Sequence, residues 1–182
     1  KPFFSTHFSN YGDSALNFIN FNKIFFRSLN NSVISEISYL EYPISKISKF
    51  GIIQKEKLQG SYSFKKIRGN ARNLMPKSEL VIIDYVGTSY IESLVSNIPT
   101  VVFFDPTTKR LNKEHQLFFN KLIKVKIFHT TPYSAALHVN NISKNPYEWW
   151  NSREVQKSKN TFIKENLDLK SLTEIIVKIN YN

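Results

Sequence analysis

The chain has 182 residues, 41% hydrophobic and 21% charged, which is the composition of a globular domain with a sizeable core rather than of a disordered chain. It contains no cysteine, which excludes disulfides and thiolate metal sites, and its four histidines lack the spacing of a zinc protease site. The formal net charge of +11 favours an anionic partner, such as a nucleotide, a nucleic acid or an acidic membrane face.

The basic residues are scattered and form neither a dense basic block nor an RNA-binding aromatic pattern, so we expect no specific nucleic-acid binding. Lys, Asn and Ile are all abundant, as in proteins of AT-rich genomes, which is a purely compositional explanation of the charge. No apolar run approaches the roughly 18 residues that cross a bilayer, and no signal peptide is visible. We therefore predict a cytoplasmic location, with peripheral contact to the inner face of the membrane left open.

Short apolar runs alternate with amphipathic segments along the chain, which predicts strands alternating with helices. Strands are predicted at residues 2–5, 23–27, 51–54, 80–83, 100–104 and 126–128. Helices are predicted at residues 13–19, 63–74, 89–97, 114–124, 132–142, 152–164 and 169–179. Residues 30–50 have no clean period, and we expect a loop with one short helix there.

The runs at 81–83 and 101–104 are apolar on both faces, as in a parallel sheet that is covered on two sides. The predicted fold is α/β, a doubly wound, Rossmann-like and mostly parallel sheet with helices on both faces and extra C-terminal helices. Because the sequence has no repeats or linkers, we expect residues 1–182 to form a single domain. Because ligands bind at the carboxyl ends of such strands, the loops at 6–12, 27–31 and 84–89 are the candidate site.

The loop at 84–89 leads from a buried strand into a helix, whose first turn offers unpaired N–H groups and a partial positive charge. Gly87 allows close approach of the backbone to a ligand, and Thr88 and Ser89 add hydroxyl groups. A diphosphate fits this arrangement. Glu92, one turn into the helix, could then accept hydrogen bonds from a ribose diol.

A capping box explains the same residues without a ligand, with Ser89 as N-cap and Glu92 three residues later. On the local pattern alone this alternative is the stronger one, because the loop has neither a GxGxxG motif nor a Walker lysine.

Four further residues are candidates at the predicted carboxyl edge. Arg27, at the end of a predicted strand, could reach a phosphate or form a surface salt bridge. Thr6 and His7, in the loop after the first strand, could contact phosphate or acceptor or could be solvated. Asp84 could orient the loop through a backbone hydrogen bond. Trp149 and Trp150 are predicted to pack a C-terminal helix onto the domain.

The unit from Asp84 to Phe104, with its small-residue loop, Glu-bearing helix and Asn-Ile-Pro turn, resembles the donor-binding half of GT-B glycosyltransferases. Within this class, the chain resembles a bacterial family of transferases of surface-carbohydrate biosynthesis. The stretches that carry this second resemblance are 23–27, 70–81, 87–92, 97–100, 127–129 and 147–156. The segment Trp149-Trp150-Asn151-Ser152 is the most specific to that family.

The resemblance implies that Glu92 binds the donor ribose and that the loop at 87–89 holds the diphosphate, with Arg27 adding positive charge. Many retaining enzymes of this class have a second Glu where this chain has Asp84, so the role of Asp84 toward the sugar stays open. The chain begins with Lys1, and the resemblance makes it the C-terminal half of a longer two-domain enzyme. The other half would hold the acceptor, so no catalytic residue is predicted.

The implied function is transfer of a sugar from a nucleotide-sugar donor to a glycan acceptor of the cell surface, with no cofactor and no metal. A sugar epimerase or a polyol-phosphate transferase of the same architecture remains an alternative. A non-catalytic module that binds a nucleotide or a protein is the third possibility. The sequence does not indicate the sugar, the stereochemical outcome or the oligomeric state.

Overall fold

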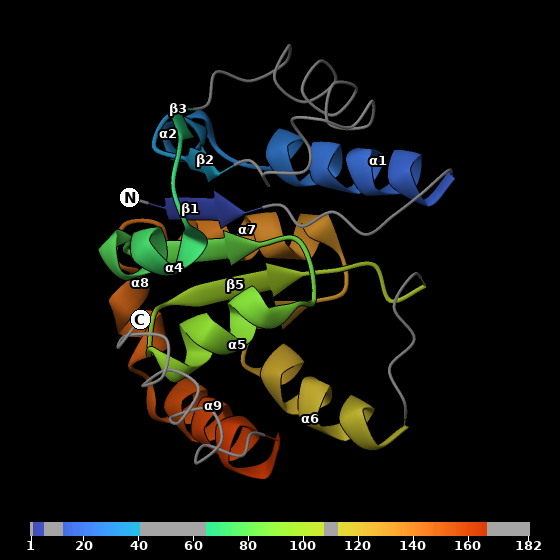
Figure 1. The fold of residues 1–182 in the computed structure, drawn as a ribbon, viewed down its shortest axis with the longest axis vertical. Coiled ribbons are helices and arrows are strands. Elements are labelled where there is room, and N and C mark those ends of the chain that lie inside the picture. The colour runs from blue at the N-terminus through green and yellow to red at the C-terminus, as the bar shows by residue number, and fades with distance from the viewer. Residues whose placement is uncertain (1, 6–12, 41–64, 108–112, 167–182) are drawn as a thin grey trace, which may run out of the picture.

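The computed structural model describes residues 2–5, 13–40, 65–107 and 113–166, and six strands within them form one parallel sheet in the order β3-β2-β1-β4-β5-β6 (Figure 1). These strands are β1 Pro2–Ser5, β2 Ser38–Leu40, β3 Lys65–Ile67, β4 Leu80–Ile83, β5 Thr100–Phe103 and β6 Phe128–His129. The register is continuous across the centre, since Phe4 pairs with Ile82 and Ile82 with Val101. The predicted α/β class with a parallel sheet is therefore confirmed.

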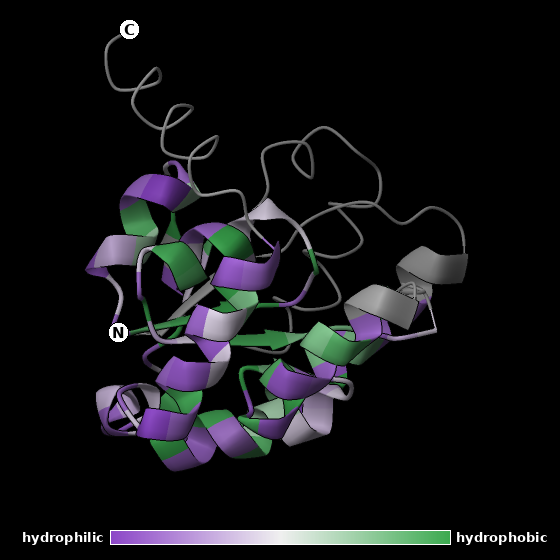
Figure 2. Ribbon diagram, turned by 90° about the horizontal axis from the view of Figure 1, so that it is seen from below, coloured by the Kyte–Doolittle hydropathy of each residue, from purple (hydrophilic) through white to green (hydrophobic). Residues whose placement is uncertain are grey.

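Helices connect these strands and extend beyond the last of them. They are α1 Asp13–Arg27, α2 Asn31–Ile34, α4 Ala71–Leu74, α5 Thr88–Val95, α6 Lys113–Lys124, α7 Pro132–Ile142, α8 Pro146–Trp150 and α9 Arg153–Asn166, with the 3-10 turn η3 at Met75–Lys77. The C-terminal helix predicted at 152–164 is α9, whereas the short helix α8 was not predicted. Hydrophobic residues concentrate on the strands and on the inner sides of the helices (Figure 2).

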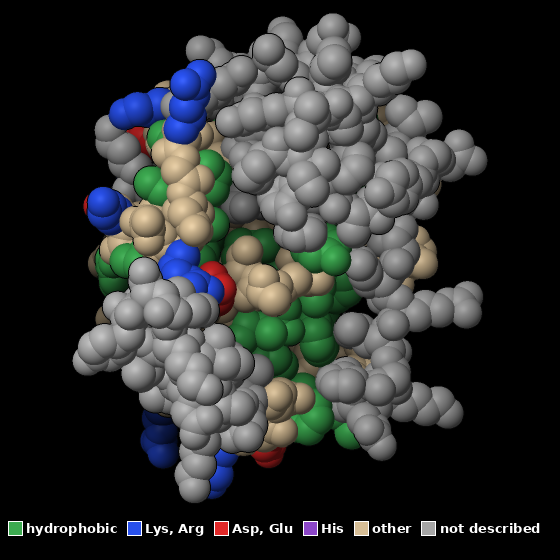
Figure 3. Space-filling model, in the orientation of Figure 1, with side chains coloured by type: hydrophobic (Ala, Val, Ile, Leu, Met, Phe, Trp, Pro, Cys, Tyr) green, Lys and Arg blue, Asp and Glu red, His purple; other side chains and the backbone are tan. Residues whose placement is uncertain are grey.

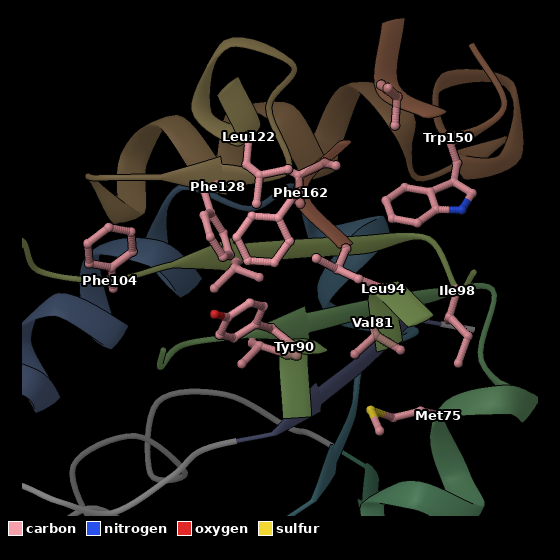
Figure 4. Close-up of a cluster of buried hydrophobic side chains, with 14 of the residues drawn as sticks. Met75, Val81, Tyr90, Leu94, Ile98, Phe104, Leu122, Phe128, Trp150 and Phe162 are labelled. Carbon is pink, nitrogen blue, oxygen red and sulfur yellow. The ribbon is translucent and has the colours of Figure 1, made fainter. Parts of the chain in front are cut away.

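Two hydrophobic cores lie on opposite faces of the sheet, because successive side chains of a strand point to opposite sides. Val81 and Ile83 of β4 face a core with residues of α5, α6 and α9, whereas Leu80 and Ile82 face a core with residues of α1 and α7. Figure 4 shows the first core, in which Tyr90 lies near Phe128 and Phe162. Every residue of β4 and β5 is buried, as their continuous apolar runs predicted.

The strand predicted at 23–27 is wrong, because these are the last five residues of α1. The buried side chains Ile19, Asn22, Phe25 and Phe26 recur at helical spacing. Asn22 hides this period in the sequence, since it is a polar residue in the buried stripe. Its Nδ2 donates to the carbonyl of Phe18 at 3.1 Å, while its buried Oδ1 has no hydrogen-bond partner among the described residues.

The helix predicted at 63–74 is also wrong, because β3 ends at Ile67 and α4 begins only at Ala71. Gly69 between them has a φ of 137°, a conformation that ends regular structure and favours glycine. Asn70 then caps α4, with Oδ1 accepting from the N–H of Arg72 at 3.0 Å. In the region predicted as a loop with a short helix, α2 is that helix, and the three-residue strand β2 was missed.

Three predicted segments lie outside the described residues. They are the loop at 6–12, the strand at 51–54 and the helix at 169–179.

Candidate functional site

The N-terminus of α5 lies at the carboxyl edge of the sheet, directly after β4. The strands β1, β4 and β5 end together there, since Ser5 pairs with Ile83 and Ile83 with Val102. Asp84 follows β4 immediately and is 3% exposed. The predicted residues Asp84, Gly87, Thr88, Ser89 and Glu92 therefore occupy one short loop and helix turn at the edge where parallel sheets bind ligands.

Gly87 lies in close contact with the ring of Tyr85 in its own loop. A Cβ atom on Gly87 would lie 2.6 Å from Cε1 of the Tyr85 ring, which is closer than such contacts occur. A side chain at this position would therefore require the Tyr85 ring to move. The sequence assigned this glycine to close approach of a ligand, and the structure gives it a second reason, close approach of Tyr85.

The capping box that the sequence allowed does not form. The N-cap of α5 is Gly87, so Ser89 lies within the helix, and the N-cap makes no side-chain hydrogen bond. Glycine has no side chain to satisfy the first N–H groups of the helix. The start of α5 thus presents backbone donors together with the hydroxyls of Thr88, which is exposed, and Ser89, which is half-buried.

Glu92 points to a neighbouring helix instead of the start of its own. Its Oε1 lies 2.7 Å from Nη2 of Arg72 on α4, and the two side chains are 34% and 50% exposed. Such a solvent-accessible ion pair contributes under about 1 kcal/mol to folding. Its effect is instead to hold a carboxylate and a guanidinium in a fixed relation, one turn from the N-terminus of α5.

Sequence reasoning missed Arg72 as a site residue. The only local signal was the Gly-Asn pair before it, which places Arg72 in the first turn of a capped helix. Its partner is twenty positions away, and no local pattern links the two residues.

Arg27 does not join this site. It is the exposed last residue of α1, and α1 runs back from the end of β1 toward the start of β2. Its neighbour Ser28 accepts a hydrogen bond from Asn140 in the last turn of α7, a helix that runs back in the same sense. Arg27 therefore lies toward the amino edge of the sheet, where its charge suits a helix C-terminus. Thr6 and His7 lie outside the described residues.

On the face shown in Figure 3, hydrophobic side chains gather in the middle and the described Lys and Arg side chains lie along one border.

Among the described residues, no group of three or more His, Cys, Asp or Glu could hold a metal ion. Within the same residues, no helix has the length and apolar character that spanning a membrane requires.

Residues 2–173 match the family model described as LIC12162 family transferase. The chain belongs to this family. No curated protein and no solved structure was found to match the chain. Membership of the LIC12162 family makes the protein a transferase, which confirms the predicted enzyme class at that level.

Proposed function

We propose that this LIC12162 family transferase moves a sugar from a nucleotide-sugar donor to a cell-surface polysaccharide or a related glycan, and that residues 1–182 hold the donor as one half of a GT-B enzyme. The observation that carries the proposal is the position of Glu92. It lies one turn into α5, at the carboxyl edge of β4, and its carboxylate is fixed by Arg72 away from the backbone donors of its own helix.

The sheet supports this proposal. Its order, β3-β2-β1-β4-β5-β6, is that of doubly wound dinucleotide-binding domains, which bind ligands where the order reverses. Here the chain builds outward from β1 to β3 and then returns to β4 on the other side of β1. The N-terminus of α5 follows β4 directly, so it lies beside this reversal, and we assign the fold to the Rossmann-like class on that basis.

The proposed chemistry rests on charge. The first N–H groups of α5 and the hydroxyls of Thr88 and Ser89 bind the diphosphate and stabilise the negative charge that develops on it as the sugar leaves. Glu92 accepts hydrogen bonds from the ribose diol, and Arg72 keeps its carboxylate in position. Asp84, buried behind the loop, orients that loop. The net charge of +11 favours the anionic donor and is compatible with contact to an anionic membrane face.

Calorimetric titration with UDP, GDP, ADP and CMP tests the proposal. At least one nucleoside diphosphate should bind, and Glu92→Ala should weaken that binding while most of the stability is kept. The matched control is Glu165→Ala, which breaks the comparable ion pair of Glu165 with Lys121 between α9 and α6. A folded domain that binds none of the four nucleotides would contradict the proposal.

The alternative functions are an epimerase, a polyol-phosphate transferase and a non-catalytic binding module. The family name favours a transferase over an epimerase or a non-catalytic module. Analysis of products formed by a protein that contains this domain together with its acceptor half distinguishes transfer of a sugar from transfer of a polyol phosphate.

A further inference from the structure

A pocket of about 420 Å³ lies along the outer edge of β6, the last strand of the sheet, and the proposed donor site does not include it. Its walls come from the end of α6, from β6 and from one side of α7. Two strands, β5 and β6, separate it from β4, the strand that leads into α5. Its volume is in the range of pockets that bind small molecules.

The polar lining of this pocket is rich in hydrogen-bond donors. Lys126 contributes an ammonium group, Thr130 a hydroxyl and Asn141 an amide, whereas the hydroxyl of Ser134 is already bonded within the wall, to His129 and to the carbonyl of Thr131. No Asp or Glu is among the described residues that line it. A lining with a cation and no carboxylate selects against cations and favours a ligand with a negatively charged oxygen group.

Two histidines form the buried part of the lining. The rings of His129 and His138 lie 5.4 Å apart, and each residue is 6% exposed. Nε2 of His129 donates to the carbonyl of Lys126 at 3.0 Å, which leaves Nδ1 as an acceptor 3.0 Å from Oγ of Ser134. Nε2 of His138 has no hydrogen-bond partner among the described residues. The ring of His138 also packs edge-on against that of Trp149 at 4.6 Å, which fixes this wall of the pocket.

The rest of the lining is apolar and sets the shape of the ligand. Ile123, Phe128 and Leu137 line the pocket beside the polar groups. The ring of Phe128 is fully buried and stacks on that of Phe119 at 4.9 Å, so Ile123 and Leu137 supply the apolar surface that a ligand can reach. The pocket therefore offers an apolar surface next to a cluster of donors, which is the usual composition of a small-molecule site.

We infer that this pocket along β6 binds a small organic anion, a phosphate or carboxylate group attached to an apolar body, with Lys126, Thr130 and Asn141 around the charged oxygens. The apolar body lies against Ile123 and Leu137. The inference does not depend on the proposed donor site, since none of its residues belongs to that site.

Phenyl phosphate and benzoate are suitable probes, because each joins one anionic group to one ring. Titration of the chain labelled with ¹⁵N-histidine, followed by NMR, should shift the ring signals of His129 and His138 in a saturable manner. The two probes show whether phosphate or carboxylate is preferred. Benzamide, which has the same ring and no charge, should shift these signals far less.

Lys126→Gln should weaken binding of the preferred probe about tenfold, as expected for loss of one charge-assisted hydrogen bond. Lys124→Gln is the matched control, because Lys124 is an exposed lysine of the same turn that does not line the pocket. Both positions are exposed, so both variants should fold. The inference is overturned if neither anion shifts the two histidine signals, if benzamide shifts them equally, or if both variants weaken binding alike.

Discussion

Nη2 of Arg72 and Oε1 of Glu92 lie 2.7 Å apart and join α4 to α5 beside the carboxyl edge of the sheet. Because both side chains reach solvent, Arg72→Gln and Glu92→Gln should each lower the free energy of unfolding by less than about 1 kcal/mol. Both should nevertheless weaken nucleoside diphosphate binding, which calorimetry measures. Lys121→Gln, which breaks the other described ion pair, should change stability by a similar amount and leave affinity unchanged. Unchanged affinity in both Arg72 and Glu92 variants would make this pair purely structural.

The contact of Tyr85 with Gly87 predicts a conditional cost for adding one methyl group. Gly87→Ala should destabilise the domain by about 1–3 kcal/mol, because the Cβ atom would collide with the ring. In a Tyr85→Ala background the same substitution should cost close to nothing, since the colliding ring is gone. Urea unfolding of the four proteins measures this coupling. Equal costs in both backgrounds would show that the glycine is needed for another reason.

Asn97 ties three elements together at the amino edge of the sheet. Nε1 of Trp150 donates to the carbonyl and to Oδ1 of Asn97. Nζ of Lys159, a residue that is 4% exposed, donates to the same Oδ1. Burial lowers the pKa of Lys159. Asn97→Gly keeps the positive φ of 53° but leaves the buried ammonium without this acceptor, so it should cost roughly 2–3 kcal/mol.

Lys159→Met tests the same cluster from the other side. It removes the buried charge while keeping most of the side-chain volume, so thermal unfolding should show little loss or a gain of stability. A loss as large as that of Asn97→Gly would mean that the ammonium contributes more through its hydrogen bond than its burial costs.

The histidines of the β6 pocket predict acid sensitivity. Burial lowers the pKa of His129 to about 4 and of His138 to about 3, and the charge of Lys126 adds to both shifts. The unfolded chain therefore binds protons below pH 6.5 that the folded chain does not. Stability should be independent of these groups above pH 6.5 and should fall as the pH drops toward 4, by about 3 kcal/mol for His129.

Unfolding by urea at several pH values measures this effect. The decline between pH 6.5 and 4.5 should be smaller in His138→Gln than in the unmodified chain. An identical slope in the two proteins would mean that other groups cause the acid sensitivity.

The sequence predicted the centre of the sheet well and its borders less well. The strands β4 and β5 are short, continuous apolar runs, which are typical of strands buried on both faces of a parallel sheet. The apolar run at 24–26 has the same appearance in the sequence but belongs to a helix. The helical period was not apparent, because one of its buried positions is the polar residue Asn22. Short elements such as β2 depend on pairing with neighbours and leave little local pattern.

The sequence predicted the loop and the helix turn of the candidate site, but it did not predict the contacts that their side chains make. The residues at 84–92 are contiguous, so the sequence alone could place them together. The direction of the Glu92 side chain depends on Arg72, and the β6 pocket depends on how α7 packs beside β6. These relations arise from tertiary packing, which the local periodicity of one sequence does not encode.

The most direct test of donor binding follows the backbone amides at the start of α5. An NMR titration of the ¹⁵N-labelled chain with UDP, GDP, ADP and CMP should shift the amides of Thr88, Ser89 and Tyr90 saturably with at least one diphosphate. Glu92→Ala should weaken that response, whereas Glu165→Ala should leave it unchanged. If these three amides do not respond to any of the nucleotides while the chain is folded, the N-terminus of α5 is not a diphosphate site and the proposed function is contradicted.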